Sequence, residues 1–330
     1  MSLLGGGDGV FYDTYVTNKP APTRPRLPEW LRVQVPDLVQ LGTFNRTREA
    51  VDGNQLATVC EEARCPNIHD CWSQGTATFM VAGEECTRGC KFCSVKTLKR
   101  PPALEADEPE RLADAAERMN LDYVVVTVVN RDDQPDGGAD HYKRCVQAVK
   151  DRLPHAGVEL LSSDLAGNWA ALEHLLDGVP LSVFAHNVEC VPRLDRRVRD
   201  PRASFDQSTE VLRRAGQLRS DVPTKTSIMV GLGETDDEVT EAMHRVRDAG
   251  VELLTLGQYV APGKPGSQFM AVDRYVHPDV FSQWADEAYA MGFKGVASGP
   301  LVRSSFRAGV LLEAAKTGRR VEELMAAPAV

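Results

Sequence analysis

The chain has 330 residues, a formal net charge of −9, a pI near 5.4 and 42% hydrophobic residues. This length allows one large domain or two ordinary ones, and the acidic balance argues against a nucleic-acid-binding protein. No apolar run approaches the roughly 20 residues that a membrane-spanning helix needs, so we expect no membrane partner.

The first residues, Met1 to Val16, are glycine-rich and contain no Lys or Arg. They lack the basic region of a secretory signal and the arginines of an organelle transit peptide. The expected compartment is therefore the cytoplasm. In a reducing compartment, clustered cysteines are more often metal ligands or catalytic groups than disulfides.

The chain divides into four expected parts. Prolines between Pro20 and Pro36 predict an extended N-terminal arm with little regular structure, anchored by Trp30 and Leu31. The parts are an arm at 1–50, a cysteine-containing segment at 51–75, a repetitive α/β body at 76–298 and a C-terminal segment at 299–330.

The body alternates short apolar runs with amphipathic helical patterns. The runs predict strands buried on both faces, at Thr78–Val81, Tyr123–Val129, Val158–Leu161, Leu181–Ala185, Thr226–Val230 and Leu253–Gln258. Helices are predicted at 108–119, 139–152, 168–177, 204–216, 235–249 and 278–291. Thr235 and Glu238 have the spacing of a capping box.

Six βα repeats predict an α/β fold with a parallel sheet and right-handed crossovers. Six repeats are too few for a closed eight-stranded barrel, so a partial (β/α)6 TIM-type barrel fits best, with a doubly wound sheet as the alternative. We expect the N-terminal and C-terminal extensions to cover the barrel mouth. In either fold, ligands bind at the C-terminal ends of the strands.

Six of the eight cysteines form two triplets, Cys60-x4-Cys65-x5-Cys71 and Cys86-x3-Cys90-x2-Cys93. The two triplets lie within the 34 residues from Cys60 to Cys93. An even spread of the eight cysteines over the chain would place about one in a stretch of 34 residues. A 4Fe–4S cluster is normally held by four thiolates. The triplets therefore predict two metal centres, each of which needs one further ligand.

The second triplet follows the first predicted strand and lies on a loop at the functional end of the barrel. Its spacing, with Phe92 before the last cysteine, resembles the radical S-adenosylmethionine (SAM) superfamily. The resemblance implies a 4Fe–4S cluster whose open iron binds SAM, and a 5′-deoxyadenosyl radical that abstracts hydrogen. A structural zinc site is the alternative, but zinc sites usually pair C-x2-C elements with four ligands in total.

The first triplet resembles that of the lipoyl synthase family. The resemblance continues along most of the chain from about residue 55. It includes Arg131–Gly138, His186–Glu189, Thr224–Thr235 and Gly299–Phe306. It implies a sulfurtransferase that inserts sulfur at C6 and C8 of a protein-bound octanoyl-lysine, with an auxiliary 4Fe–4S cluster as the sulfur donor.

The same resemblance implies the protein partners. They are octanoylated lipoyl carrier domains, such as the glycine cleavage H protein and the E2 subunits of 2-oxoacid dehydrogenases. A ferredoxin- or flavodoxin-type reductant and an iron–sulfur carrier for cluster repair complete the set.

The resemblance also assigns a fourth auxiliary ligand, Ser305, in a motif where Phe306 replaces the usual tyrosine. A serine oxygen matches a sulfur-rich cluster less well than a thiolate, which suits a cluster that must come apart. The segment Gly263–Gly266 departs from the family pattern, which usually has basic and histidine residues there.

Other residues have two interpretations each. Phe92 either lies against the adenine of SAM or packs in the barrel mouth, and Asn187 and Glu189 either contact SAM or support those that do. Gly231 and Gly233 allow close backbone approach or form a tight turn.

Cys145 is expected to be a buried hydrophobe and Cys190 incidental. A biotin-synthase-like sulfur inserter, the enzymatic alternative, would need these two as ligands inside the barrel. A two-cluster electron carrier, the non-enzymatic alternative, would need four ligands per cluster and no barrel.

Overall fold

The computed structural model describes residues 27–32, 42, 44–45, 48–49, 51, 53, 56–62, 65, 67–73, 78–263 and 267–326. Most of the predicted N-terminal arm lies outside these residues. Within the arm, the 3₁₀ helix η1 (Glu29–Leu31) buries Leu31, while the Trp30 ring makes an edge contact with His277 at 5.1 Å between centroids.

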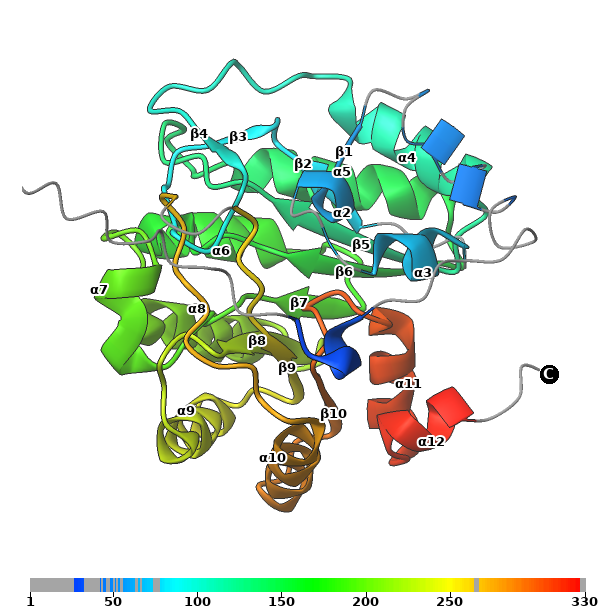
Figure 1. The fold of residues 1–330 in the computed structure, drawn as a ribbon. Helices are drawn as coiled ribbons and strands as arrows, with labels where there is room; N and C mark the ends of the chain where they lie inside the picture. Colours follow the sequence, from blue (N-terminus) through cyan, green and yellow to red (C-terminus); the bar gives the residue numbers. More distant parts are fainter. Residues whose placement is uncertain are drawn as a thin grey trace, which may run out of the picture.

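The described residues form one eight-stranded sheet with the order β1-β2-β5-β6-β7-β8-β9-β10 (Figure 1). Strand β1 pairs antiparallel with β2, and every later neighbour pairs in parallel. The strands are β1 (Ala57–Thr58), β2 (Thr78–Val81), β5 (Tyr123–Val128), β6 (Gly157–Leu161), β7 (Val183–Ala185), β8 (Thr224–Val230), β9 (Leu253–Gln258) and β10 (Gly295–Gly299). A parallel sheet with neighbours in sequence order is a series of βα repeats, so the predicted α/β partial barrel is confirmed.

All six predicted strands are present, and the structure adds a seventh parallel strand, β10. Its sequence, Gly-Val-Ala-Ser-Gly, consists mainly of small residues that are uncommon in strands. Tertiary packing against β9 creates this strand, which explains why local sequence preference did not predict it.

The described helices are α2 (Val59–Glu62), α3 (Ile68–Ser73), α4 (Glu108–Arg118), α5 (Ala139–Arg152), η2 (Leu165–Gly167), α6 (Trp169–Leu176), η3 (Pro192–Leu194), α7 (Asp195–Val198), α8 (Phe205–Leu218), α9 (Asp236–Asp248), α10 (Pro278–Ala290), α11 (Ala308–Thr317) and α12 (Val321–Ala326). The long helices that follow β2 to β9 cover the outer face of the sheet, as predicted (Figure 1). The predicted capping box is present at the start of α9, where Thr235 and Glu238 each bond the other's backbone N–H.

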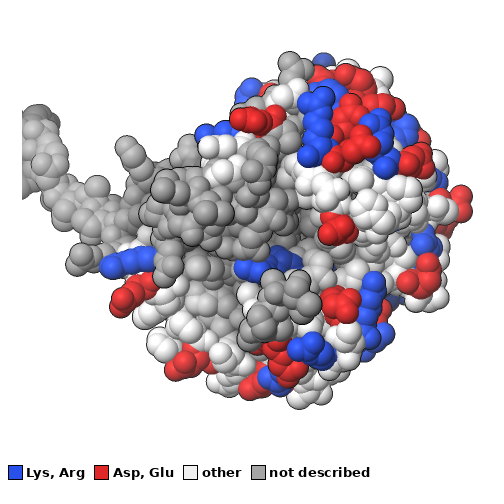
Figure 2. Space-filling model, turned by 90° about the vertical axis from the view of Figure 1, so that its right-hand side faces the viewer, with Lys and Arg blue, Asp and Glu red and all other residues white. Residues whose placement is uncertain are grey.

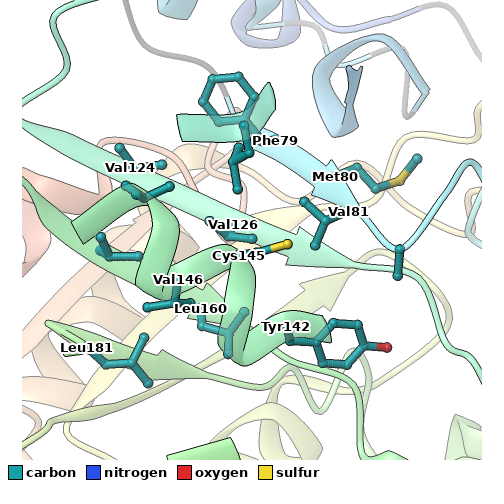
Figure 3. Close-up of a cluster of buried hydrophobic side chains, with 14 of the residues drawn as sticks. Phe79, Met80, Val81, Val124, Val126, Tyr142, Cys145, Val146, Leu160 and Leu181 are labelled. Carbon is teal, nitrogen blue, oxygen red and sulfur yellow. The ribbon is translucent and has the colours of Figure 1, made fainter. Parts of the chain in front are cut away.

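The main apolar core lies between the sheet and its outer helices. Alternate residues of β5, Val124 and Val126, point outward and pack with side chains of α5 such as Tyr142 and Val146 (Figure 3). Cys145 lies in the same cluster and is fully buried. This confirms its expected role as a hydrophobic core residue.

The segment after β10 runs down the open side of the sheet. Gly257, near the C-terminal end of β9, faces the Val302 carbonyl, and Ser305 is hydrogen-bonded to Thr78, the first residue of β2. Four residues further on, Gly309 packs beside Tyr123, the first residue of β5. One continuous segment therefore connects the two ends of the partial barrel.

Helix α11 covers the N-terminal ends of the strands. Its Leu311 packs with Val183 and Leu253, which begin β7 and β9. The C-terminal extension was expected over the mouth. Its helix lies at the opposite end because its apolar face matches the apolar first residues of these strands.

In the part of the chain that the structure describes, no helix is both long enough and apolar enough to span a bilayer. Acidic and basic side chains are interspersed over the described surface visible in Figure 2. This pattern is typical of a solvated protein surface.

We expect Gly257→Ala to destabilise the protein. An added Cβ would lie 2.1 Å from the Val302 carbonyl oxygen, so the C-terminal segment must shift. Overpacking of this kind costs about 1–3 kcal/mol, measurable as a lower thermal midpoint. The control is Gly216→Ala in α8, where the added Cβ would meet Thr224 at an ordinary 3.8 Å. Equal midpoints for the two variants would contradict the close packing.

Candidate metal centres

The second cysteine triplet lies on a closed loop after β2. Short strands β3 (Glu85–Cys86) and β4 (Lys96–Thr97) pair at the two ends of this loop, and Cys90 and Cys93 lie between them. The chain enters the loop through Ala82 and Gly83, both with positive φ. As predicted, the three cysteines lie at the C-terminal end of the sheet.

Distant segments hold the loop through its backbone. Gly89 N–H donates to Asp200 at 2.9 Å, and Lys91 N–H donates to the Val198 carbonyl at 2.8 Å. The Lys91 carbonyl accepts from Met270 N–H, also at 2.8 Å. The loop is therefore fixed from both sides of the mouth, as a cluster ligand loop must be.

A buried guanidinium fixes the loop between two carboxylates. Arg88, next but one to Cys86, pairs with Asp132 at 2.8 Å and Asp164 at 2.7 Å. Burial alone would lower the pKa of Arg88, but the hydrogen bonds from Asp132 and Asp164 raise it overall. Asp132 of the Arg131–Gly138 segment thus positions the cysteine loop.

Two of the loop thiols are strongly affected by burial. It raises the pKa of the Cys90 thiol to about 11 and that of Cys93 to about 12. Backbone N–H groups already point at two sulfurs, from Arg88 to Cys86 at 3.4 Å and from Asp200 to Cys90 at 3.3 Å. Bound iron would favour thiolates that accept such bonds, so these residues fit an iron–sulfur cluster.

Glu189 lies close to the cysteine loop. Burial raises its own pKa, and its negative charge helps to raise the pKa values of Cys90 and Cys93. Its backbone φ is +68°, a strained value for a residue with a side chain, and Asn187 hydrogen-bonds its carboxylate. Phe92 packs against the neighbouring apolar cluster.

Packing accounts for Gly231. An added Cβ there would lie 2.1 Å from Gln258 Nε2 and 2.5 Å from the Arg274 carbonyl oxygen. The buried Glu234 carboxylate accepts the Gly231 N–H at 2.6 Å. Gly233 has φ +106°, with Asp273 at 3.8 Å from an added Cβ. The turn after β8 therefore requires both glycines for its shape.

His186 has a structural role in the buried network. Its two ring nitrogens contact the Ser162 carbonyl at 2.8 Å and the Ser208 hydroxyl at 2.9 Å. Arg199 also donates to Ser208, at 2.8 Å. Burial lowers the pKa of His186 to about 4, so the imidazole is neutral at pH 7.

The first cysteine triplet spans α2, α3 and the chain between them. Cys60 is buried, and burial raises its thiol pKa. The same sulfur accepts a backbone hydrogen bond from Thr78 and lies within electrostatic range of Cys65. Cys71 is half-buried and packs against the main core.

The C-terminal segment meets this triplet, as the Ser305 prediction requires. Thr78 Oγ1 donates to Ser305 Oγ at 2.9 Å, and Asn67 donates to the Leu301 carbonyl at 2.6 Å. Arg303 lies within electrostatic range of Cys65. Cys60 and Ser305, which are far apart in sequence, thus both contact Thr78, and this arrangement fits the predicted second cluster.

A single-ion zinc site fits neither triplet. Among the described residues, the potential ligand atoms that lie within 4.8 Å of one another belong to Glu108, His141 and Cys145. A single ion needs its ligands this close, whereas the corners of a cluster hold thiolates further apart.

The Glu108 carboxylate has a different use, because it accepts the Ala82 N–H at 2.8 Å at the entry to the cysteine loop. Arg131 binds the Ala82 carbonyl from the other side at 3.0 Å.

Sequence reasoning did not identify Glu108, Arg88, Asp164 or Thr78 as residues that support the site. Arg88 was signalled by its place between Cys86 and Cys90, but its partners are far apart in sequence.

Cys145 and Cys190 belong to two different buried apolar clusters, and Cys145 packs on the helix side of the sheet. The two thiols therefore do not form a common ligand set, which argues against the biotin-synthase-like alternative.

Comparisons with known proteins agree with this geometry. The profile of the radical SAM superfamily matches residues 80–246, and that of the N-terminal domain of lipoyl synthase matches residues 11–65. The chain is 50% identical to "Lipoyl synthase, mitochondrial" of Bos taurus over 293 residues, which covers 87% of this chain and 76% of the relative. The Danio rerio relative of the same name is 50% identical over 306 residues, covering 89% and 74%.

Solved structures show the same fold at low sequence identity. Streptococcus suis SuiB bound to S-adenosylmethionine has a TM-score of 0.51 and 9% identity, covering 70% of this chain and 53% of its own. HydG, a maturase of the [FeFe]-hydrogenase, has a TM-score of 0.50 and 14% identity, covering 81% and 57%. These likenesses concern the fold alone.

The expected cytoplasmic compartment is wrong. The relatives from Bos taurus, Danio rerio and Homo sapiens are all named mitochondrial, which contradicts that expectation. The absence of Lys and Arg from Met1–Val16 was not sufficient to predict the compartment.

Acidification should destabilise the protein partly through His186. Its folded pKa of about 4 lies below the unfolded value of about 6.5, so the folded state binds fewer protons between these values. The stabilisation is complete above pH 6.5 and is lost as pH falls towards 4, by at most about 3 kcal/mol. Urea unfolding at several pH values should show a flatter dependence for His186→Gln. Exposed His155→Gln is the control, and a wild-type slope in both variants would exclude this role.

Proposed function

We propose residue roles from the premise that this chain belongs to the lipoyl synthase family of the radical SAM superfamily. Lipoyl synthases are sulfurtransferases that act on lipoyl carrier proteins and use SAM and 4Fe–4S clusters. They insert sulfur at C6 and C8 of a protein-bound octanoyl-lysine.

One observation carries the assignment of two distinct centres. Thr78, at the start of β2, contacts both Cys60 and Ser305, whereas the Cys86–Cys93 loop follows the end of the same strand. Three residue steps of a strand span roughly 10 Å. The centres are thus separate but close enough to act on one substrate chain.

Cys86, Cys90 and Cys93 hold the cluster whose open iron binds SAM. Cys60, Cys65, Cys71 and Ser305 hold the auxiliary cluster. When bound, the first cluster with SAM supplies the 5′-deoxyadenosyl radical that removes hydrogen, and the second supplies the sulfur. This division assigns residues 51–75 and 299–330 to the auxiliary centre and 76–298 to the radical centre.

Residues near the cysteine loop and after strands β7 and β8 are proposed to help bind SAM. The electrostatic effect of Glu189 on Cys90 and Cys93 supports a contact of Glu189 with bound SAM, with Asn187 orienting its carboxylate. Phe92 packs beside the loop and is proposed to face the adenine. Gly231 and Gly233 let the backbone after β8 approach the cofactor.

The substrate and protein partners are proposed from the family. Octanoylated H protein and E2 carrier domains would present the octanoyl-lysine, a ferredoxin- or flavodoxin-type protein would supply electrons, and an iron–sulfur carrier would rebuild the auxiliary cluster. Exposed Lys91, Arg196 and Arg197 lie on or beside the segments that hold the cysteine loop, where a docked carrier would reach.

The reaction can be tested on an octanoyl-lysyl peptide incubated anaerobically with SAM and reductant. Mass spectrometry should detect the gain of two sulfurs, as the dithiol or, after oxidation, as the disulfide with two fewer hydrogens. Chromatography should detect 5′-deoxyadenosine. Cys90→Ala should abolish 5′-deoxyadenosine because it removes a ligand of the radical centre. Cys65→Ala should retain its formation but block sulfur insertion.

Cys190→Ala is the control for both readouts, since Cys190 is a buried cysteine of an apolar cluster and is not a proposed ligand of either centre. Loss of 5′-deoxyadenosine to the same extent in Cys65→Ala and Cys90→Ala would refute the division of labour. An unmodified peptide from the wild-type chain would refute the proposed reaction.

Two clusters also set the iron content. Anaerobically reconstituted protein should contain about eight irons per chain, because each 4Fe–4S cluster has four. Either Cys65→Ala or Cys90→Ala should lower the content to about four. A wild-type content near four would be incompatible with two centres and is measurable by elemental analysis.

A further inference from the structure

Thr78 contacts the auxiliary centre from two sides, although it belongs to neither ligand motif. Its side-chain hydroxyl donates to Ser305 Oγ at 2.9 Å, and its backbone N–H bonds the Cys60 sulfur. Thr78 is 4% exposed, so water does not readily replace these bonds. One residue thus connects the proposed oxygen ligand with a proposed sulfur ligand.

Thr78 is also held rigidly by the sheet. Strand β2 pairs with β5 through Thr78 and Val125, and with the antiparallel β1 on its other side. Thr78 itself pairs with Val125, and the next two residues of β2 pair with β1, so Thr78 is a precise support for a ligand. Ser305, by contrast, lies in the turn between β10 and α11 and has no strand to hold it.

The contacts that bring Ser305 to Thr78 are backbone contacts of its own segment. The Val302 carbonyl packs on Gly257, and the Leu301 carbonyl accepts from Asn67. They fix the direction of the segment but leave the Ser305 side chain to its own partner. Among the described residues, that partner is Thr78.

We propose that Thr78 is a positioning residue for the auxiliary cluster, which directs the Ser305 oxygen and stabilises its anionic form as a ligand. This rests on the proposed function, in which Ser305 is the fourth ligand. With the cluster bound, Ser305 would be an alkoxide ligand that has lost its proton to solvent, and the Thr78 hydroxyl would hold this oxygen through the hydrogen bond seen in the structure.

A hydrogen bond to a charged group is stronger than one between neutral groups. Loss of the Thr78 hydroxyl should therefore weaken ligation by Ser305 by about tenfold to a hundredfold. A Thr78→Val variant keeps the backbone hydrogen bond to the Cys60 sulfur and the strand pairing with Val125. The effect should thus be confined to the oxygen ligand.

The test measures how fast a chelator removes iron from the full-length, reconstituted protein under anaerobic conditions. Thr78→Val, which keeps the branched shape, should lose about four irons at least tenfold faster than the wild type. Its 5′-deoxyadenosine formation should persist, because the radical centre is unaffected. Thr78→Ser keeps the hydroxyl and should behave like the wild type, and Thr78→Ala should match Thr78→Val.

Thr255→Val is the matched control, because Thr255 is another fully buried threonine of the sheet, on β9, and its hydroxyl has no hydrogen-bond partner among the described residues. Its iron loss should equal that of the wild type. Faster loss in Ser305→Ala combined with wild-type loss in Thr78→Val and Thr78→Ala would overturn the role of Thr78. Wild-type loss in Ser305→Ala would instead remove Ser305 as a ligand and overturn the inference with it. Neither result would bear on sulfur insertion by the wild-type chain, which tests the function separately.

Discussion

The geometry of the proposed site depends on strand β2. Its four residues are buried and lie between β1 and β5. Thr78 at its start contacts the auxiliary ligands, and the radical-centre loop begins just after Val81 at its end. A short strand pinned on both sides cannot stretch, so the distance between the centres is a property of the sheet. The same octanoyl chain can then meet the hydrogen-abstracting radical and the sulfur donor.

Buried charges hold the loop that leaves this strand. Glu108 accepts a hydrogen bond from the Ala82 N–H, and Arg131 donates one to the Ala82 carbonyl. Arg88 forms ion pairs with both Asp132 and Asp164. Removing one partner from a buried pair costs about 3–5 kcal/mol, because the other charge stays behind without compensation. These groups hold the backbone and side chains next to the cysteines, so Arg131 and Asp132, which follow β5, have a structural role in the loop.

Sequence reasoning predicted what local patterns encode. Apolar runs located six of the strands. Cysteine spacing predicted two ligand sets, and their assignment to two clusters stays a prediction. The seventh strand, β10, was not predicted, because Gly295 and Gly299 have low strand preference and depend on β9 for pairing. Contacts such as Thr78 with Ser305 join residues that are 227 positions apart. No local pattern encodes such a contact, and the family resemblance alone pointed to Ser305.

The origin of the fourth ligand explains why the two centres differ. The three cysteines of each set lie within a short segment, so their release would require that segment to unfold. Ser305 comes from a separate segment that follows β10 and rests on Gly257 and Asn67 through its backbone. Its oxygen can therefore leave the cluster by a side-chain rotation while these backbone contacts persist. In the proposed division, the donor cluster must open repeatedly and needs such a ligand, whereas the radical centre would keep its open position for SAM and need no fourth side chain.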